Sequence, residues 1–188
     1  VLDHNKSNRH QVGIYPEIKA PVFHQKSGLD TTKIIHDNLL GHYQQNPGFK
    51  IIVQCFASKT LKRLHAEKTP FMLVQLIGEN SWGESADNYK KMRTRSGLKK
   101  VSQYAAGIGP WLNHLYDRRT KGPKRIIKVA KKLGMVIHPY TLRNDSLPRF
   151  VRTEEQVIYF LTQYGVDGIF TDNAHTTLKY INKHKGTK

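Results

Sequence analysis

Six short apolar runs, each followed by a segment with helical spacing, constrain the fold of this chain more than any other feature. Several runs are apolar on both faces, which is typical of strands buried in a parallel sheet. Each parallel crossover needs a helix on its return path. The alternation therefore predicts a parallel α/β fold. The predicted strands are residues 14–19, 50–56, 71–77, 105–111, 135–141 and 166–172.

Helix signals lie between these runs, and a last helix with Leu178 and Ile181 precedes a basic tail from Lys183. The boundary signals are cap residues of the kinds that helix ends prefer. They are Asp30 and Ser58 as N-caps, Pro123 in a first turn, Gly134 as a C-cap, and Thr153 with Gln156 as a capping box.

Residues 78–95 interrupt the alternation, because they have neither strand nor helix periodicity. A connector between neighbouring elements is usually shorter than this. We predict a binding loop or lid here, with Trp82 as its anchor.

The length of 188 residues fits one domain. A TIM barrel closes at eight β/α units, so about six consecutive units predict an incomplete (β/α)₈ barrel. The chain opens on Val1 and Leu2 without an initiator Met, and it shows no apolar signal-peptide core and no membrane span. We therefore expect residues 1–188 to form a single domain that is incomplete at its N-terminus.

The chain is strongly basic, with 31 Lys and Arg against 14 Asp and Glu and a formal net charge of +17. Such an excess favours polyanionic partners, namely nucleic acid, anionic membrane or a phosphorylated substrate. Most basic residues fall on predicted helices, where a solvated outer face is the alternative. The single cysteine, Cys55, excludes an internal disulfide and cannot by itself complete a cysteine zinc site.

Polar side chains occur at the carboxyl ends of the predicted strands, where parallel α/β folds place their active sites. Glu17 and Lys19 are two residues apart and therefore share one face of their strand. A carboxylate suits Ca²⁺ or Mg²⁺, and an ammonium suits a phosphate oxygen. An ion pair at the strand end is the alternative. The other polar candidates are Gln54, Cys55, Gln75, His138, Tyr140, Thr171 and Asp172.

These candidates also have structural interpretations. Gln54, Cys55 and Gln75 fit positions inside a barrel, and His138 fits a core histidine. Asp172 fits the N-cap of the last helix, which is the interpretation that its position favours.

Other catalytic patterns are absent from the sequence. It has neither a glycine-rich phosphate loop after a strand nor a Gly-x-Ser-x-Gly elbow, which excludes P-loop nucleotide hydrolases and common esterases. His36 and Asp37 lie in the middle of a predicted helix, and we expect them on its solvated face.

Several segments together resemble one enzyme family. They are Tyr15-Pro16-Glu17-Ile18-Lys19-Ala20-Pro21 followed by Phe23-His24, Val53-Gln54-Cys55-Phe56, Leu73-Val74-Gln75-Leu76-Ile77, Ala106-Gly107-Ile108-Gly109-Pro110, Val136-Ile137-His138-Pro139-Tyr140-Thr141 and Gly168-Ile169-Phe170-Thr171-Asp172. In this order, from about Val1 to about Asn182, they resemble the bacterial periplasmic type of glycerophosphodiester phosphodiesterase. The resemblance implies a (β/α)₈ barrel of the phospholipase C-like phosphodiesterase type. It also implies metal-dependent hydrolysis of glycerophosphodiesters, such as glycerophosphocholine or glycerophosphoethanolamine, to glycerol 3-phosphate and an alcohol.

The resemblance also implies roles for individual residues. Glu17 matches the metal-binding carboxylate of the family, and Lys19 matches the lysine near the substrate phosphate. The metal is expected to be Ca²⁺ rather than Mg²⁺. His138 and Asp172 are further candidates, although Asn173-Ala174-His175 departs from the family pattern after Asp172. The residues expected to line the substrate pocket are Gln54, Phe56, Gln75 and Tyr140.

The family's two catalytic histidines have no counterpart here. One belongs to a His-Arg-Gly motif and one to a later His-Asp motif, with a Glu-x-Asp pair between them. In this chain Arg9-His10 is reversed and His36-Asp37 falls in a predicted helix. The six predicted strands correspond to the last six of eight, so no catalytic residue is assigned and we expect the chain alone to be inactive.

The resemblance sets expectations for location and partners as well. It implies a periplasmic or secreted protein that acts on a small-molecule substrate rather than on nucleic acid. The open barrel edges predict self-association. The alternative function is a non-catalytic basic protein that binds anionic lipid headgroups or nucleic acid.

Overall fold

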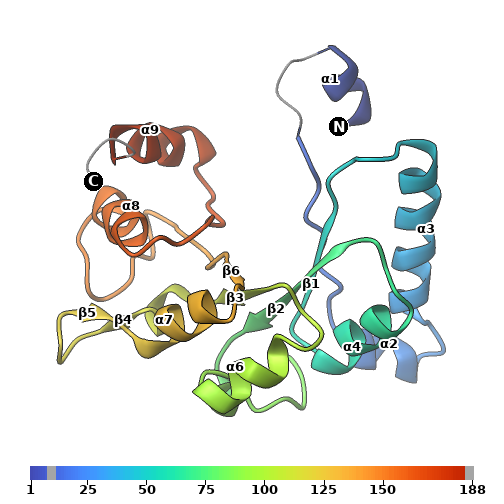
Figure 1. Cartoon of the computed structure of the whole chain (residues 1–188), viewed down its shortest axis with the longest axis horizontal. Helices are drawn as coiled ribbons and strands as arrows, with labels where there is room; N and C mark the ends of the chain where they lie inside the picture. Colours follow the sequence, from blue (N-terminus) through green and yellow to red (C-terminus); the bar gives the residue numbers. More distant parts are fainter. Residues whose placement is uncertain (8–11, 185–188) are drawn as a thin grey trace.

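A computed structural model describes residues 1–7 and 12–184 and has a four-stranded parallel sheet at its centre (Figure 1). Its strands are β1 (Ile52–Cys55), β2 (Met72–Ile77), β3 (Gly107–Pro110) and β6 (Val136–Ile137), in that spatial order. The predicted α/β class is confirmed. The Arg9-His10 pair and the end of the basic tail lie outside the described residues.

The first and last predicted strands lie beside this sheet but are isolated bridges rather than strands, which corrects the prediction of six regular strands. Ile14 and Glu17 pair in parallel with Ile51 and Gln54. The missing hydrogen bond of this ladder falls at Pro16, which has no N–H to donate. The sheet nevertheless keeps six neighbouring segments in chain order, as in an incomplete barrel.

The last segment pairs in the same way with the residues that follow β6. Phe170 N–H donates to Pro139 O at 2.9 Å, and Leu142 N–H donates to Phe170 O at 2.8 Å. Leu142 and Thr171 form a parallel bridge. Pro139 interrupts this ladder because it too lacks a donor.

Helices cover the outer side of the sheet. In Figure 1, α2, α3 and α4 lie near the N-terminal edge, and α8 with α9 lies near the other. No helix in the described ranges is long and apolar enough to cross a membrane. The α-helices are α1 (Leu2–Ser7), α2 (Pro21–Lys26), α3 (Thr31–Gln45), α4 (Ser58–Ala66), α5 (Tyr89–Met92), α6 (Arg95–Val101), α7 (Arg125–Lys132), α8 (Glu154–Gln163) and α9 (Ala174–His184). Two 3₁₀ helices, η1 (Asn80–Trp82) and η2 (Leu112–His114), and a hairpin of β4 (Tyr116–Asp117) and β5 (Gly122–Pro123) complete the fold.

Three of the predicted boundary signals are confirmed, whereas Pro123 is not in a first turn, because it lies in β5 and α7 begins at Arg125. The Asp30 carboxylate accepts from Lys33 N–H at 3.0 Å, and Thr153 Oγ1 accepts from Gln156 N–H at 3.2 Å. Gly134 has the positive φ of 69° that a helix end favours.

Ser58 is not an N-cap, because α4 begins at this residue. The Asp87 carboxylate, from the loop after β2, accepts from Ser58 N–H and Ser58 Oγ at 2.7 Å each. A carboxylate 29 residues away in sequence therefore replaces a local cap.

The inner face of the sheet is covered near its carboxyl edge. Val74 and Leu76 alternate with the helix-facing residues of β2 and are 0% and 3% exposed. Gly109 brings β3 close to them, since a Cβ there would meet Leu76 Cδ2 at 2.6 Å. Met72, on the same face at the start of β2, is 38% exposed, so the open barrel is packed at one end of this strand and uncovered at the other.

His36 is also placed differently from the prediction, because it is buried rather than solvated. Its Nε2 lies 3.0 Å from Thr69 Oγ1, and its ring packs edge-on against Phe71. Helical spacing along α3 could not indicate this contact, because Thr69 lies 33 positions further along the chain, after α4.

Two helical glycines give a matched test of the packing. A Cβ on Gly97 would collide with the Lys91 carbonyl oxygen and lie 2.7 Å from Met92 Cα, whereas Gly41 faces open space. We expect Gly97→Ala to lower the free energy of unfolding by about 1–3 kcal/mol, the usual cost of overpacking. Gly41→Ala should raise it by about 0.5–1 kcal/mol. Urea denaturation measures both, and equal effects would contradict the packing at Gly97.

The sheet edges predict self-association. Among the described residues, no segment pairs with the outer side of residues 14–19 or 166–172. Unpaired N–H and C=O groups at such edges can pair with a second chain. Light scattering over about a hundredfold concentration range should show an average mass above that of one chain. A monodisperse monomer with a cooperative thermal transition would show that the edges are protected.

Candidate functional site

Glu17 and Gln54 lie side by side at the carboxyl edge of the sheet. A parallel bridge joins them, and Ile18 N–H donates to Gln54 O at 3.0 Å. Burial raises the pKa of Glu17, the nearby Lys19 opposes this, and the negative charge of Glu84 adds to it. Lys19 itself is exposed. The site therefore begins with a half-buried carboxylate beside a solvated ammonium.

Gln54 carries a buried polar atom without a partner. The residue is 6% exposed, and its Oε1 makes no hydrogen bond within the described structure. Leaving such an atom unsatisfied costs about 1–3 kcal/mol, so natural structures rarely keep one without a reason. The atom is available to a donor that the described residues do not supply.

Phe56 and Tyr140 form an aromatic wall together with Tyr89. The Phe56 ring lies 5.8 Å from that of Tyr140 and 6.0 Å from that of Tyr89. Tyr140 donates its hydroxyl proton to Ile77 O at 3.2 Å, and burial raises its pKa. Burial also raises the pKa of Tyr89 to about 12. Both phenols therefore stay neutral near pH 7.

Tyr15 links the first segment to the last two across the inner face. Its hydroxyl lies 3.1 Å from His138 Nδ1, and its ring lies 4.8 Å from that of Phe170. Burial lowers the pKa of His138 and raises that of Tyr15. His138 is therefore half-buried and neutral near pH 7. Its hydrogen bond to Tyr15 fits the interpretation of His138 as a core histidine.

Gln75 and Cys55 face the helices. Gln75 is fully buried, its Nε2 donates to Phe56 O at 2.8 Å, and its Oε1 accepts from Tyr104 Oη at 2.8 Å. Cys55 Sγ lies 3.1 Å from Ile18 O, and burial raises its pKa to about 11. These contacts hold neighbouring strands and loops together and leave Gln75 with protein partners at both ends of its amide.

Asp172 is exposed and does not cap the last helix, which corrects that interpretation. The α9 helix begins at Ala174, and Asn173 Oδ1 accepts from Thr176 N–H at 3.4 Å. Asp172 instead lies 3.5 Å from Arg143 Nε.

The metal-ligating side chains present do not complete a cation site. Within the described ranges, no group of three or more His, Cys, Asp or Glu is placed to hold an ion. Ca²⁺ takes six to eight oxygen ligands, and Mg²⁺ takes six. Glu17, even with Glu84 nearby, therefore fits only a part of such a site.

Sequence reasoning missed Tyr15, Glu84 and Tyr89. Glu84 and Tyr89 fall in the predicted binding loop at residues 78–95, for which the sequence indicated only Trp82 as an anchor. Tyr15 belongs to the segment that contains Glu17, two positions earlier and therefore on the same face.

The loop is held in place by a partly buried group of polar side chains around Glu79 rather than left open. Arg93 makes two hydrogen bonds to the Glu79 carboxylate, at 3.0 and 3.2 Å, and His114 Nε2 lies 2.7 Å from Glu79 Oε1. Trp82 stays 41% exposed and packs against Trp111 at 5.2 Å. These contacts fix both ends of the loop.

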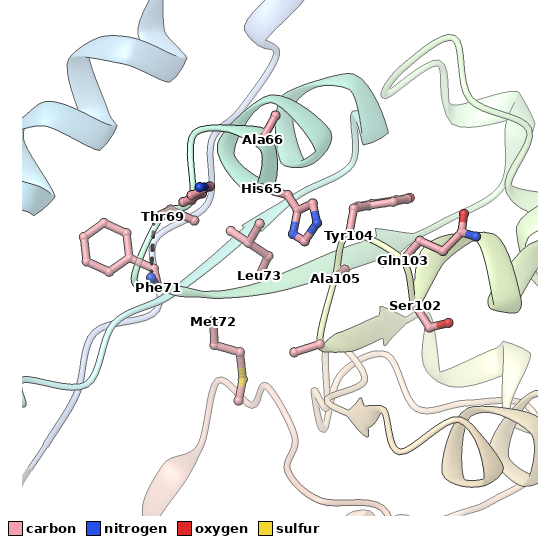
Figure 2. A pocket seen from close by; sticks show the side chains of 12 residues that line it. His65, Ala66, Thr69, Phe71, Met72, Leu73, Ser102, Gln103, Tyr104 and Ala105 are labelled. Carbon is pink, nitrogen blue, oxygen red and sulfur yellow. Dashed lines mark hydrogen bonds between the residues drawn. The ribbon is translucent and has the colours of Figure 1, made fainter.

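A separate hollow of about 700 Å³ lies at the amino ends of β2 and β3 (Figure 2). Its lining includes His65 of α4, Leu73 of β2 and Tyr104 in the turn after α6. It is at the opposite end of the strands from Glu17, so it does not belong to the candidate site.

Comparison with known proteins decides the family. The model of the glycerophosphoryl diester phosphodiesterase family matches residues 1–176. This chain belongs to that family. A glycerophosphodiester phosphodiesterase of Haemophilus influenzae is 32% identical over 97% of this chain and 55% of its own length. One of Treponema pallidum is 26% identical over 92% of this chain and 54% of its own length.

Solved structures of this family share the fold. A putative glycerophosphoryl diester phosphodiesterase of Silicibacter pomeroyi matches with a TM-score of 0.62 and 17% identity over 89% of this chain and 49% of its own. A phosphodiesterase of Oleispira antarctica, solved with the product sn-glycerol-3-phosphate, matches with a TM-score of 0.62 and 14% identity over 91% of this chain and 56% of its own. The chain thus spans about half the length of the relatives it matches.

Burial of His114 predicts that the stability of the folded chain depends on pH. Burial lowers the pKa of His114 to about 4, despite the adjacent Glu79 carboxylate. The unfolded chain takes up a proton near pH 6.5, whereas the folded chain does not. Stability is therefore full above about pH 6.5 and falls by roughly 3 kcal/mol as the pH drops toward about 4.

Denaturant titrations between pH 7 and pH 4 measure this loss. His114→Gln should flatten the slope in that interval, because the variant cannot titrate. His175→Gln, at an exposed position, is the control and should keep the wild-type slope. An unchanged slope in His114→Gln would rule out His114 as its source.

Proposed function

We propose that this chain supplies the carboxyl-terminal part of the site of a metal-dependent glycerophosphodiester phosphodiesterase. The reaction would convert glycerophosphodiesters, such as glycerophosphocholine or glycerophosphoethanolamine, to glycerol 3-phosphate and an alcohol. The observation that carries the proposal is the grouping of Glu17, Gln54, Phe56 and Tyr140 at one sheet edge, with Gln54 Oε1 buried and unpartnered. The product bound to the Oleispira antarctica relative supports it.

Each residue of the site has a proposed role. The exposed Lys19 would bind a phosphate oxygen as a point charge. Gln54 would accept a hydrogen bond from a substrate hydroxyl, and the rings of Phe56 and Tyr140 would pack against the carbon skeleton. Glu17 would be one ligand of a divalent metal, with Ca²⁺ favoured over Mg²⁺ because its coordination is more flexible.

We assign no described residue as the general acid or the general base of the reaction. His36 is buried against Thr69, which precedes β2, so it lies toward the amino ends of the strands and away from Glu17. His138 is hydrogen-bonded to Tyr15. Each missing acid or base lowers the rate by about 10²- to 10⁴-fold. We therefore propose that the 188 residues alone are inactive and bind metal weakly.

The alternative of a non-catalytic binding protein has less support. Many basic side chains, among them Lys62, Lys99 and Lys128, are exposed on α4, α6 and α7. Charge spread over outer helices serves solvation more than recognition of one partner. We propose a small-molecule substrate rather than nucleic acid, and a periplasmic or secreted location.

Two measurements test the proposal that the chain alone is inactive and binds metal weakly. Calorimetric titration with Ca²⁺ should give weak binding, and glycerophosphocholine with Ca²⁺ should release no glycerol 3-phosphate above background. Turnover by the isolated chain would overturn the claim that it lacks the acid and base.

Complementation tests the proposal that this chain supplies the carboxyl-terminal part of an active site. The residues of the Haemophilus influenzae relative that precede its matched region should restore turnover when mixed with this chain. Glu17→Gln should then lower the rate at least about a hundredfold, since losing even an outer-shell metal partner costs 10- to 100-fold. Asp37→Asn, on α3, is the control. Restored turnover that survives Glu17→Gln would exclude Glu17 as a metal ligand.

A further inference from the structure

A cationic groove lies beside the candidate site, between the β4–β5 hairpin and the loop that precedes α8. Its volume is about 780 Å³. The two walls are about 30 residues apart in sequence, so only the fold brings them together. The lining residues are Trp111, Asn113, Tyr116, Asp117, Arg118, Arg119, Lys124, Ser146, Leu147, Arg149 and Phe150.

The positive side chains in the groove outnumber its single carboxylate and lack ion-pair partners among the described residues. Arg118, Arg119, Lys124 and Arg149 line it, and none makes an ion pair with a described residue. The one carboxylate in the lining is that of Asp117. Its Oδ1 accepts hydrogen bonds from the backbone N–H of Arg119, at 2.9 Å, and from the backbone N–H of Thr120, at 3.4 Å. This carboxylate therefore stabilises the hairpin turn. Elsewhere in the chain, arginines such as Arg63 and Arg93 face carboxylates.

Aromatic stacking fixes the two walls against each other. The Tyr116 ring, in β4, stacks on Phe150 with centroids 4.3 Å apart and planes 13° apart. Phe160 of α8 packs against both rings. The stack therefore joins the base of the hairpin to the loop before α8 and places the cations of the two walls beside one groove.

The groove is continuous with the carboxyl edge of the sheet. Trp111 lines the groove and pairs in a parallel bridge with Tyr140 of the candidate site. Leu112 N–H donates to Tyr140 O at 3.0 Å. A ligand in the groove would therefore lie next to the aromatic wall of that site.

We propose that this groove binds a soluble small molecule that carries more than one phosphate. Four cations without an ion-pair partner among the described residues match several negative charges, although Lys124 Nζ also donates to Asn113 O at 3.3 Å. The rings of Trp111 and Tyr116 offer apolar surface for the rest of the ligand. A flat membrane surface is contacted most readily by cations that protrude, whereas these four line a depression. The proposal does not require the chain to be catalytic.

Trp111 provides the signal for a binding test. The chain has two tryptophans, so Trp82→Phe leaves Trp111 as the single tryptophan reporter inside the groove. Inorganic tripolyphosphate, titrated at low salt, should change its fluorescence and bind more tightly than orthophosphate. Added salt should weaken the binding, because screening reduces charge attraction.

Matched variants distinguish binding in the groove from non-specific attraction to the positive charge of the whole chain. Arg118→Ala with Arg119→Ala removes two charges from one wall, and Arg149→Ala removes one from the other. Each should lower the affinity at least about fivefold, which is the order expected for lost charged hydrogen bonds. Arg95→Ala with Lys99→Ala removes two exposed charges from α6 and should change the affinity less than about twofold. Thermal melts confirm folding, and Arg118→Lys with Arg119→Lys should retain most of the binding.

The outcomes are distinct from those of the hydrolysis assays. Equal losses in the groove variants and the α6 control would overturn the groove and leave only non-specific attraction. Binding to vesicles that contain phosphatidylglycerol, without binding to tripolyphosphate, would assign the cations to a membrane and also overturn it. Tight binding by the catalytically silent chain would support the groove whether or not complementation restores turnover.

Discussion

Parallel pairing between neighbours in sequence is the constraint on which the rest of the structure depends. Each of the six segments hydrogen-bonds to the next, from residues 14–19 to residues 166–172. Because every connection returns through a helix or loop, all carboxyl ends meet at one edge. Glu17, Gln54, Phe56 and Tyr140 come together for this reason, although more than 120 positions separate the first from the last.

The outer segments are attached less regularly than the central strands, and prolines explain the difference. Pro16 and Pro139 each remove one donor from a ladder, so the pairing persists as bridges with gaps. Side chains compensate on the inner face. The contact of Tyr15 with His138 and Phe170 connects the first segment to the far side of the open sheet. It covers apolar surface that a complete barrel would enclose with two more strands.

Charged side chains in this molecule serve two different ends. Glu79 and Arg93 form an ion pair, and with the neutral His114 ring they fasten the loop after β2. The cations of the groove, only one loop away, lack such partners and are positioned by the Tyr116–Phe150 stack. Net charge alone did not distinguish these cases, because +17 describes the whole chain. Pairing within the fold separates cations that stabilise it from cations that remain available to a ligand.

The sequence by itself determined the fold class, the four central strands, most helix caps and the edge on which Glu17 lies, because periodicity and capping are local properties. The family followed from short segments in a fixed order. Tertiary structure decided which polar groups are satisfied. Gln75 and Gln54 are both strand glutamines, yet Gln75 is hydrogen-bonded at both ends of its amide while Gln54 keeps an unpartnered oxygen. It also decided that Asp87 rather than Ser58 caps α4, that His36 is buried, and that two distant loops enclose a cationic groove. These outcomes depend on contacts between units far apart in the chain, which spacing along the sequence does not encode.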